Sequence, residues 1–196
     1  MIENGFHAVP PGKVPMVVTH LEMRAPVLRA ARLPDGLRFE RIEPDVDSYR
    51  ALFRRVGDDW LWFGRLELAD AALQAILDDP QVHMFTLLKE GQPEAILELD
   101  FREERTCELA YFGLTPALIG TGAGAYLMDR AVDHAFRAEI DRFHVHTCNI
   151  DSPQALPFYL RSGFEATRQE VEIADDPRLR GLLPETCAPH VPLIRP

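Results

Sequence analysis

The sequence has few cysteines and no long hydrophobic run. Its three cysteines, Cys107, Cys148 and Cys187, are an odd number at wide spacing, which predicts neither a disulfide framework nor a zinc site and fits a reducing compartment. No stretch approaches the roughly 18 apolar residues of a membrane-spanning helix. Residues 1–20 lack the charged-then-apolar pattern of a signal peptide. We therefore expect a cytoplasmic protein with no membrane partner and no bound metal.

Positive charge is in the minority. The chain has 21 Lys and Arg against 31 Asp and Glu, a formal net charge of −10 at pH 7. Nucleic-acid-binding domains usually carry an excess of positive charge, which this chain lacks, so no nucleic-acid partner is expected. It slightly favours a cationic partner such as an amine, although many cytosolic proteins are acidic. A length of 196 residues with 46% hydrophobic and 27% charged residues is typical of one globular domain.

Apolar periodicity predicts a mixed order of strands and helices. Residues 1–15 resemble a flexible lead, and residues 16–196 are expected to form a single domain. Strands are expected at 16–23, 37–44, 82–91, 93–104, 106–114, 142–148 and 164–173, with a last short strand at 190–194. Helices are expected at 46–56, 67–79 and 152–163, and another has an apolar stripe from Leu127 to Phe136. The three strands between 82 and 114 indicate an antiparallel meander.

The segment LIGTGAGAYLM, residues 118–128, places Gly120, Gly122 and Gly124 at the entrance of a helix. Glycine weakens a helix by about 1 kcal/mol relative to alanine, so a special backbone conformation or a close approach is expected here. Unpaired N–H groups and the helix dipole favour an anion at a helix N-terminus. The segment therefore predicts a cradle for a diphosphate. The alternative is a tight turn with close strand–helix packing.

A dinucleotide fingerprint also fits part of this segment. Gly120-x-Gly122-x-x-Ala125 matches its looser form, and Asp141 follows about 20 residues later. However, the Thr115-Pro116 turn separates the glycines from the preceding strand, and a meander replaces the expected βαβ unit. NAD(P) binding therefore stays a weaker alternative.

Two motifs resemble the GNAT N-acetyltransferase superfamily. FGLTPALIGTGAGAYLM, with Ile119-x-x-Gly122-x-Gly124, is similar to the segment that binds acetyl-CoA. SPQALPFYLRSGF is similar to the closing motif of the family, in which Ala155, Tyr159, Gly163 and Phe164 match. Together with the order of elements, the resemblance covers residues 37–174. Ile119 replaces the usual Arg or Gln, and Ser152 replaces the usual Asn.

The resemblance implies a mixed α/β fold: one GNAT-like domain with a mostly antiparallel central sheet, splayed between its fourth and fifth strands, and helices on both faces. It implies direct transfer of an acetyl group from acetyl-CoA to a primary amine, with coenzyme A as product. A backbone N–H near Gly113 or Leu114 would polarise the thioester carbonyl. The implied cofactor-binding residues are Phe112, Gly113, Leu114, Ile119, Gly120, Thr121, Gly122, Ala123, Gly124, Ala125 and Ser152.

Two residues resemble the acid and base of the family. Glu108 matches the strand glutamate that serves as base, and we expect partial burial among apolar neighbours to raise its pKa toward neutrality. A solvated strand carboxylate is the alternative, and Glu98 and Asp100 are reserve candidates. Tyr159 matches the tyrosine that protonates the leaving thiolate. A half-buried aromatic residue is the alternative.

Other residues are expected to shape the acceptor site. Trp60, Trp62 and Phe63 lie in a loop that forms the acceptor pocket in the family, or else cover the core as a lid. His144, His146 and Cys148 share one strand face; packing is favoured over a metal site, and His146 would line the cleft. The acceptor would be a small-molecule or peptide amine. The oligomeric state stays open, a homodimer included, and a non-catalytic acyl-CoA-binding sensor or structural module is the alternative function.

Overall fold

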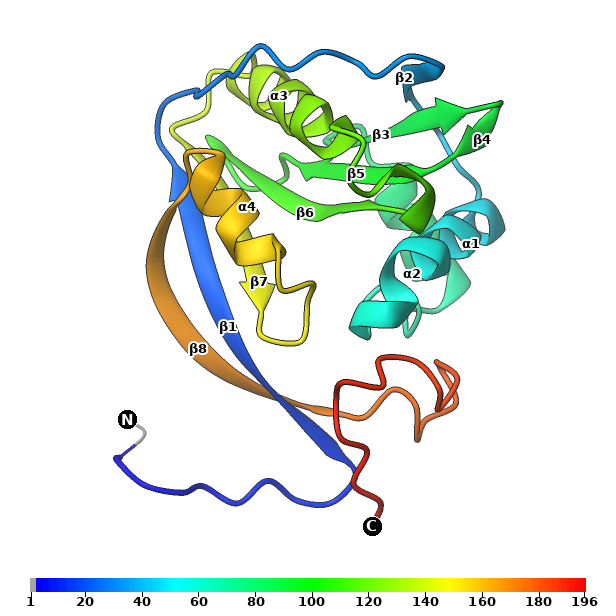
Figure 1. Ribbon diagram of the computed structural model, residues 1–196, viewed down its shortest axis with the longest axis vertical. Coiled ribbons are helices and arrows are strands. Elements are labelled where there is room, and N and C mark those ends of the chain that lie inside the picture. Colours follow the sequence, from blue (N-terminus) through cyan, green and yellow to red (C-terminus); the bar gives the residue numbers. More distant parts are fainter. Residues whose placement is uncertain (1–2) are drawn as a thin grey trace.

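The computed structural model describes residues 3–196, which form one sheet flanked by helices (Figure 1). The sheet order is β2-β3-β5-β6-β7-β1-β8, and β4 pairs with β3. The strands are β1 (Lys13–Met23), β2 (Leu37–Arg41), β3 (Val82–Lys89), β4 (Gln92–Pro93), β5 (Ala95–Asp100), β6 (Thr106–Leu114), β7 (Arg142–Cys148) and β8 (Glu165–Asp175). The helices are α1 (Val46–Gly57), α2 (Asp70–Leu77), α3 (Ala123–Phe136) and α4 (Ala155–Arg161), with short 3-10 turns η1 (Asp58–Trp60) and η2 (Pro116–Leu118).

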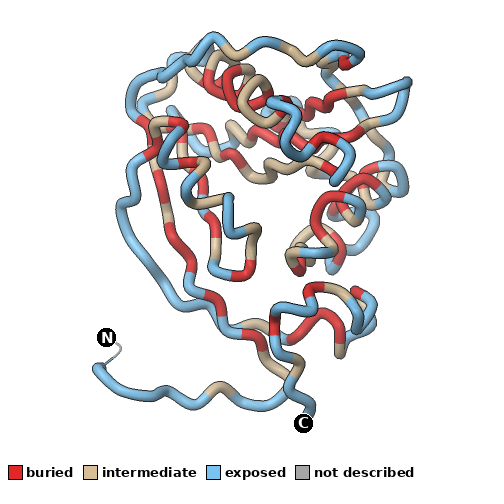
Figure 2. Tube along the Cα trace, in the orientation of Figure 1, coloured by how far each residue is buried: buried red, intermediate tan, exposed pale blue. Residues whose placement is uncertain are grey.

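Helices cover both faces of the sheet, as expected. α1 and α2 pack on one face and α3 and α4 on the other, and each face has its own hydrophobic cluster (Figures 1 and 2). α1 buries Tyr49, Leu52, Phe53 and Val56 at helical spacing, and the Asp45 carboxylate caps its first turn by accepting the Ser48 N–H at 2.7 Å. The predicted single domain of mixed α/β class therefore has a core on each side of one sheet.

The sheet is splayed between β6 and β7, which are the fourth and fifth strands of the predicted motif region. They pair in parallel only from Thr106–Arg142 to Glu108–His144. β6 then continues to Leu114 and β7 to Cys148 without pairing with each other. A bulge in β6 beside Leu99 increases the local twist where the two strands separate. The predicted cleft between these strands is confirmed.

The N-terminal strand β1 lies inside the sheet, between β7 and β8. It is antiparallel to both, with Val18 opposite Cys148 and Lys13 opposite Asp175. The sequence predicted a strand at 16–23 without a position for it. In the predicted N-terminal lead, residues 1 and 2 lie outside the described part of the chain, residues 3–12 carry no helix or strand, and β1 already begins at Lys13.

Several predicted boundaries are corrected. No strand forms at 190–194 within the described chain. The buried Arg178 instead pairs with Asp176 at 2.8 Å and donates to the carbonyls of Ala188 and Val191, which holds the C-terminal segment in turns. The strand expected to reach 104 ends at Asp100, whose carboxylate accepts the Arg102 N–H and turns the chain. The helices expected at 67–79 and 152–163 are shorter, as α2 and α4.

Candidate active site

The glycine segment joins β6 to α3. Gly120 and Gly122 have φ of +78° and +87°, and a Cβ at either would meet nothing within 4 Å, so backbone conformation explains both glycines. Gly124 lies in the first turn of α3, where a Cβ would be 3.5 Å from Leu114 Cδ1.

This segment is exposed from Ile119 to Gly122. Within residues 3–196, no hydrogen-bond acceptor is assigned to the N–H groups of Gly120, Gly122, Gly124 and Ala125. An exposed row of free donors at the start of a 14-residue helix fits a diphosphate such as that of coenzyme A.

The edge of β6 that faces the cleft offers two further donors. They can be identified from Thr115, just after β6, whose N–H points away from the cleft and donates to the Glu94 carbonyl at 3.0 Å. Because N–H groups alternate sides along a strand, the Gly113 N–H also faces β5, whereas those of Phe112 and Leu114 face the cleft. Of the two positions expected to polarise a carbonyl, geometry therefore favours Leu114 over Gly113.

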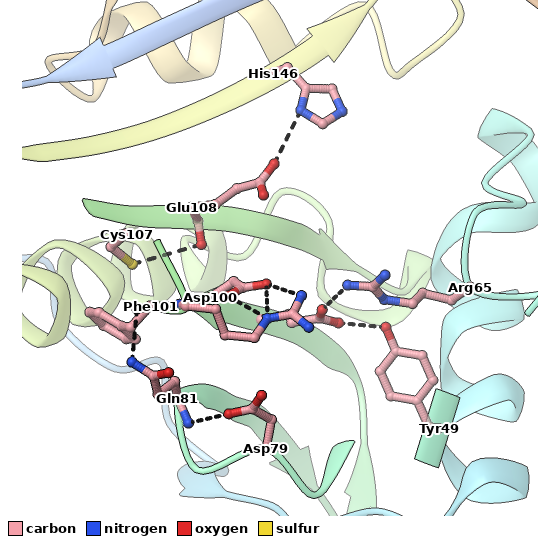
Figure 3. A network of polar contacts seen from close by, with 11 residues as sticks. Tyr49, Arg65, Asp79, Gln81, Asp100, Phe101, Cys107, Glu108 and His146 are labelled. Atoms are coloured by element: carbon pink, nitrogen blue, oxygen red, sulfur yellow. Dashed lines mark hydrogen bonds and ion pairs between the residues drawn. The ribbon is translucent and has the colours of Figure 1, made fainter. Parts of the chain in front are cut away.

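Glu108 and His146 meet across the cleft (Figure 3). The Nδ1 of His146 on β7 lies 3.4 Å from Oε1 of Glu108 on β6. The hydrogen bond to His146 lowers the pKa of Glu108, and the same contact raises the pKa of His146 above its usual 6.5. The expectation that burial raises the Glu108 pKa toward neutrality is therefore wrong, because the imidazole stabilises the carboxylate more than burial disfavours it.

The two reserve carboxylates are held by arginines. Glu98 is fully buried, accepts the Tyr49 hydroxyl at 2.6 Å and pairs with Arg65 at 2.5 Å (Figure 3). Asp100 pairs with Arg102, whose hydrogen bonds lower the Asp100 pKa against the effect of burial. Glu98 thus anchors the loop of Arg65 to the sheet, and both carboxylates are already engaged by arginine partners.

Tyr159 lies on the inner side of α4 and is more buried than the half-buried alternative, with 7% of its surface exposed. Its ring centroid lies 6.3 Å from that of Phe112 and 5.9 Å from that of Phe164. Burial, and then the negative charge of Asp151, raise the Tyr159 pKa well above 10. The phenol therefore keeps its proton at neutral pH.

The expected aromatic loop divides between two places. Trp62 packs on Phe53 and Tyr111 and donates from Nε1 to Asp151 at 3.1 Å, which brings it to the cleft. Trp60 instead lies against His190 of the C-terminal segment, with ring centroids 5.7 Å apart. Phe63 packs at the margin of the core beneath α1 and α2.

Sequence reasoning missed Asp151 and His20. Asp151 accepts three hydrogen bonds and lies three residues beyond the end of β7. His20 pairs with Glu170 at 2.7 Å and lies 5.8 Å from the His146 ring. A groove of about 580 Å³ crosses this part of β7, β1 and β8, lined by Val18, His20, His146, Gln169, Glu170, Val171 and Glu172. Only the position of β1 beside β7 brings His20 to the site, and local periodicity carries no signal of it.

Of the remaining expected residues, Ser152 lies just before α4, where its hydroxyl accepts the Gln154 N–H at 3.3 Å. Ile119 is 63% exposed at the glycine segment. Across residues 3–196, no group of three or more His, Cys, Asp or Glu side chains is placed to hold a metal ion. In the same part of the chain, no helix has both the length and the hydropathy needed to cross a bilayer.

The chain belongs to the acetyltransferase (GNAT) family. The family model matches residues 49–164, which is more than half of the chain and includes both motifs, β6, β7 and the glycine segment. The resemblance seen in the sequence is therefore confirmed. Enzymes of this family use acetyl-CoA as acyl donor. No curated protein matches the sequence.

Solved structures show the same fold. A GCN5-related N-acetyltransferase from Sphaerobacter thermophilus matches with a TM-score of 0.61 and 15% identity over 83% of this chain and 52% of that one. A GCN5-related N-acetyltransferase from Kribbella flavida matches with a TM-score of 0.57 and 17% identity over 87% of this chain and 63% of that one. A third structure is an aminoglycoside acetyltransferase from an uncultured soil metagenomic sample, solved in complex with sisomicin. It matches with a TM-score of 0.53 and 19% identity over 70% of this chain and 94% of that one. The chain spans only about half to two thirds of the first two proteins.

Proposed function

We propose that the protein is an N-acetyltransferase that moves the acetyl group of acetyl-CoA directly to a primary amine. One observation carries the proposal. The opening between β6 and β7 has free N–H donors at the start of α3 on one side and the Glu108–His146 pair facing the other sheet face. A donor and an acceptor can thus reach the same gap from opposite sides of the sheet.

When bound, acetyl-CoA supplies the activated acetyl thioester. The N–H groups of Gly120, Gly122, Gly124 and Ala125 would hold its diphosphate, and the cleft edge of β6 would pair with the extended arm. The Leu114 N–H would donate to the thioester oxygen as negative charge develops there. Since these contacts come from the backbone, Ile119 and Ser152 are compatible with binding.

His146 would accept the proton of the amine. Its Nδ1 faces Glu108, which favours a proton on Nδ1 and leaves the Nε2 lone pair for the substrate. As the amine nitrogen bonds to the carbonyl carbon, the carbon–sulfur bond breaks, and the Tyr159 phenol would donate its proton to the thiolate. Glu108 would orient the imidazole and stabilise the positive charge that His146 gains with the proton. This assigns the base to the pair instead of to Glu108 alone.

The acceptor would be a small-molecule or peptide amine with positive charge. Glu170 and Glu172 line the groove beside His146, and Glu172 contributes to raising the His146 pKa. A carboxylate-lined groove favours a cationic ligand over an anionic one. An acetyltransferase of similar fold has been solved with sisomicin, an aminoglycoside, which supports an amine-rich acceptor.

Calorimetric titration with acetyl-CoA, and with NADPH as control, tests the cofactor site. Micromolar binding of acetyl-CoA alone is expected, and tighter binding of NADPH would favour the dinucleotide alternative. Release of coenzyme A is then followed over a panel of amines. Tight binding with no release from any amine would favour the alternative, a non-catalytic acyl-CoA-binding module.

A further inference from the structure

The side chain of Trp62 bridges the two strands that separate at the cleft. Its six-membered ring faces β6, where Cη2 lies 3.0 Å from a Cβ built on Gly113. Its Nε1 donates to Asp151, three residues beyond the last residue of β7. The indole therefore spans the opening between β6 and β7 on the face covered by α1.

Trp62 is fixed in this position from several sides. Phe53 and Tyr111 pack on it with ring centroids 5.5 and 5.3 Å away. Asp151 is itself held, because it accepts the Thr147 hydroxyl at 2.6 Å and the Cys148 N–H at 2.9 Å. An indole held by two tilted aromatic contacts and by a fixed acceptor cannot swing aside without losing both.

Two glycines make room for this side chain. A Cβ on Gly57 would lie 2.5 Å from Trp62 Cβ, and a Cβ on Gly113 would lie 2.4 Å from Val56 Cγ1 and 3.0 Å from the indole. Neither glycine has a positive φ, so backbone conformation does not explain them. The contact between Gly113 and Trp62 brings the ring against the stretch of β6 whose flanking N–H groups face the cleft.

We propose that Trp62 sets the length of the acyl group this site accepts, by closing the opening just beyond the thioester carbonyl. The proposal rests on the acyl transfer proposed above. Gly113 lies between Phe112 and Leu114, the two donors that face the cleft, so the ring stands next to the carbonyl position. An acetyl group ends after one carbon beyond the carbonyl, whereas butyryl and hexanoyl chains would meet the indole.

The test measures binding, so it needs no knowledge of the acceptor. Dissociation constants of CoA, acetyl-CoA, butyryl-CoA and hexanoyl-CoA are measured by calorimetry for the wild type, Trp62→Ala and Trp62→Phe. The wild type is expected to bind hexanoyl-CoA about tenfold or more weakly than acetyl-CoA, because a closed pocket rejects even single added methylenes by such factors. Trp62→Ala is expected to remove most of this difference while changing CoA affinity little.

Trp60→Ala is the matched control. Trp60 lies two residues earlier in the same loop and packs on His190 instead of on Gly113, so this variant should keep the wild-type preference for acetyl-CoA. Trp62→Phe keeps an aromatic ring against Phe53 and Tyr111 and serves if Trp62→Ala does not fold. It loses the bond to Asp151 and the outer ring, and should relax the preference at least for butyryl-CoA.

Three results would overturn the proposal. The first is equal affinity of the wild type for all three thioesters. The second is a loss of affinity for every ligand by one common factor in the Trp62 variants. The third is a Trp60→Ala variant that relaxes the preference as much as Trp62→Ala does. If instead acetyl-CoA binds and is turned over but the selectivity does not depend on Trp62, only the role of Trp62 fails. If neither CoA nor any thioester binds, the proposed function fails together with it.

Discussion

His146 Nδ1 lies 3.4 Å from Glu108 Oε1, and this contact joins β7 to β6 at the end of their paired segment. The last pair of that segment is Glu108 and His144. The two side chains thus face each other where the strands begin to separate. Each changes the other: the Glu108 pKa is lowered and the His146 pKa is raised. The neutral form of His146, which can accept a proton, therefore grows as pH rises through a pKa above 6.5.

Activity should rise with pH along this titration. Glu108→Gln removes the largest cause of the raised His146 pKa, so the midpoint of kcat/KM against pH should move to lower pH with a reduced plateau. His146→Ala should lower kcat by roughly 10²–10⁴-fold, the usual contribution of a positioned base. Glu104→Gln, in the exposed turn before β6, is the control. A Glu108→Gln profile identical to the wild type would contradict this assignment.

Removing the Tyr159 hydroxyl should slow the chemical step. Tyr159→Phe keeps the ring packed on Phe112 and Phe164, so acetyl-CoA binding should stay close to the wild type while kcat falls about 10²-fold or more. Steady-state kinetics with the best amine measures both. Tyr126→Phe on α3 is the matched control. An equal and small effect of both variants would leave Tyr159 with a packing role only.

Gly122 should matter for binding beyond its backbone strain. Gly122→Ala puts a Cβ on a residue with φ of +87°, at a cost of about 1–2 kcal/mol, beside the free donors before α3. Acetyl-CoA affinity should fall by tenfold or more in calorimetry, about 1.4 kcal/mol. Gly91→Ala, with φ of +83° in the turn before β4, carries the same strain far from the site. Equal loss of affinity in both would count against the cradle.

Glu98 should prove structural. Its buried pair with Arg65 means that Glu98→Ala leaves a largely buried guanidinium without its partner, at a cost of about 3–5 kcal/mol. Urea unfolding measures the loss. Glu98→Gln should also destabilise the fold but leave the midpoint of the pH–activity profile unchanged. A shifted midpoint would restore Glu98 as a candidate base.

The stability of the protein should fall in mild acid. His83 Nδ1 lies 2.8 Å from His134 Nε2, and burial is the largest cause that lowers both pKa values below 6.5. A histidine with a lowered folded pKa contributes stability above the unfolded pKa of 6.5, and this is lost as pH falls toward the folded pKa. Urea unfolding at pH 7.5 and pH 5.5 should show the decrease. His134→Gln should reduce it, whereas His7→Gln should not.

The sequence alone determined most of the local structure. Apolar stripes placed α1 and α3, and alternation placed β2, because these patterns follow from burying one face of an element. Turn signals between apolar runs separated β3, β5 and β6. Positive φ at Gly120 and Gly122 likewise follows from the need for glycine in such turns. The two motifs and their separation also indicated the family, which the match over residues 49–164 confirms.

Only the tertiary structure decided how distant segments meet. The insertion of β1 between β7 and β8 brings His20 next to His146, and no local pattern encodes strand order. The ionisation of Glu108 depended on a histidine 38 positions away that only the splayed sheet brings to it. The hydrogen bond between Trp62 and Asp151 likewise joins residues that lie far apart in the sequence. Periodicity reports which face of an element is buried, whereas pKa values and cleft shape depend on what the opposite element presents.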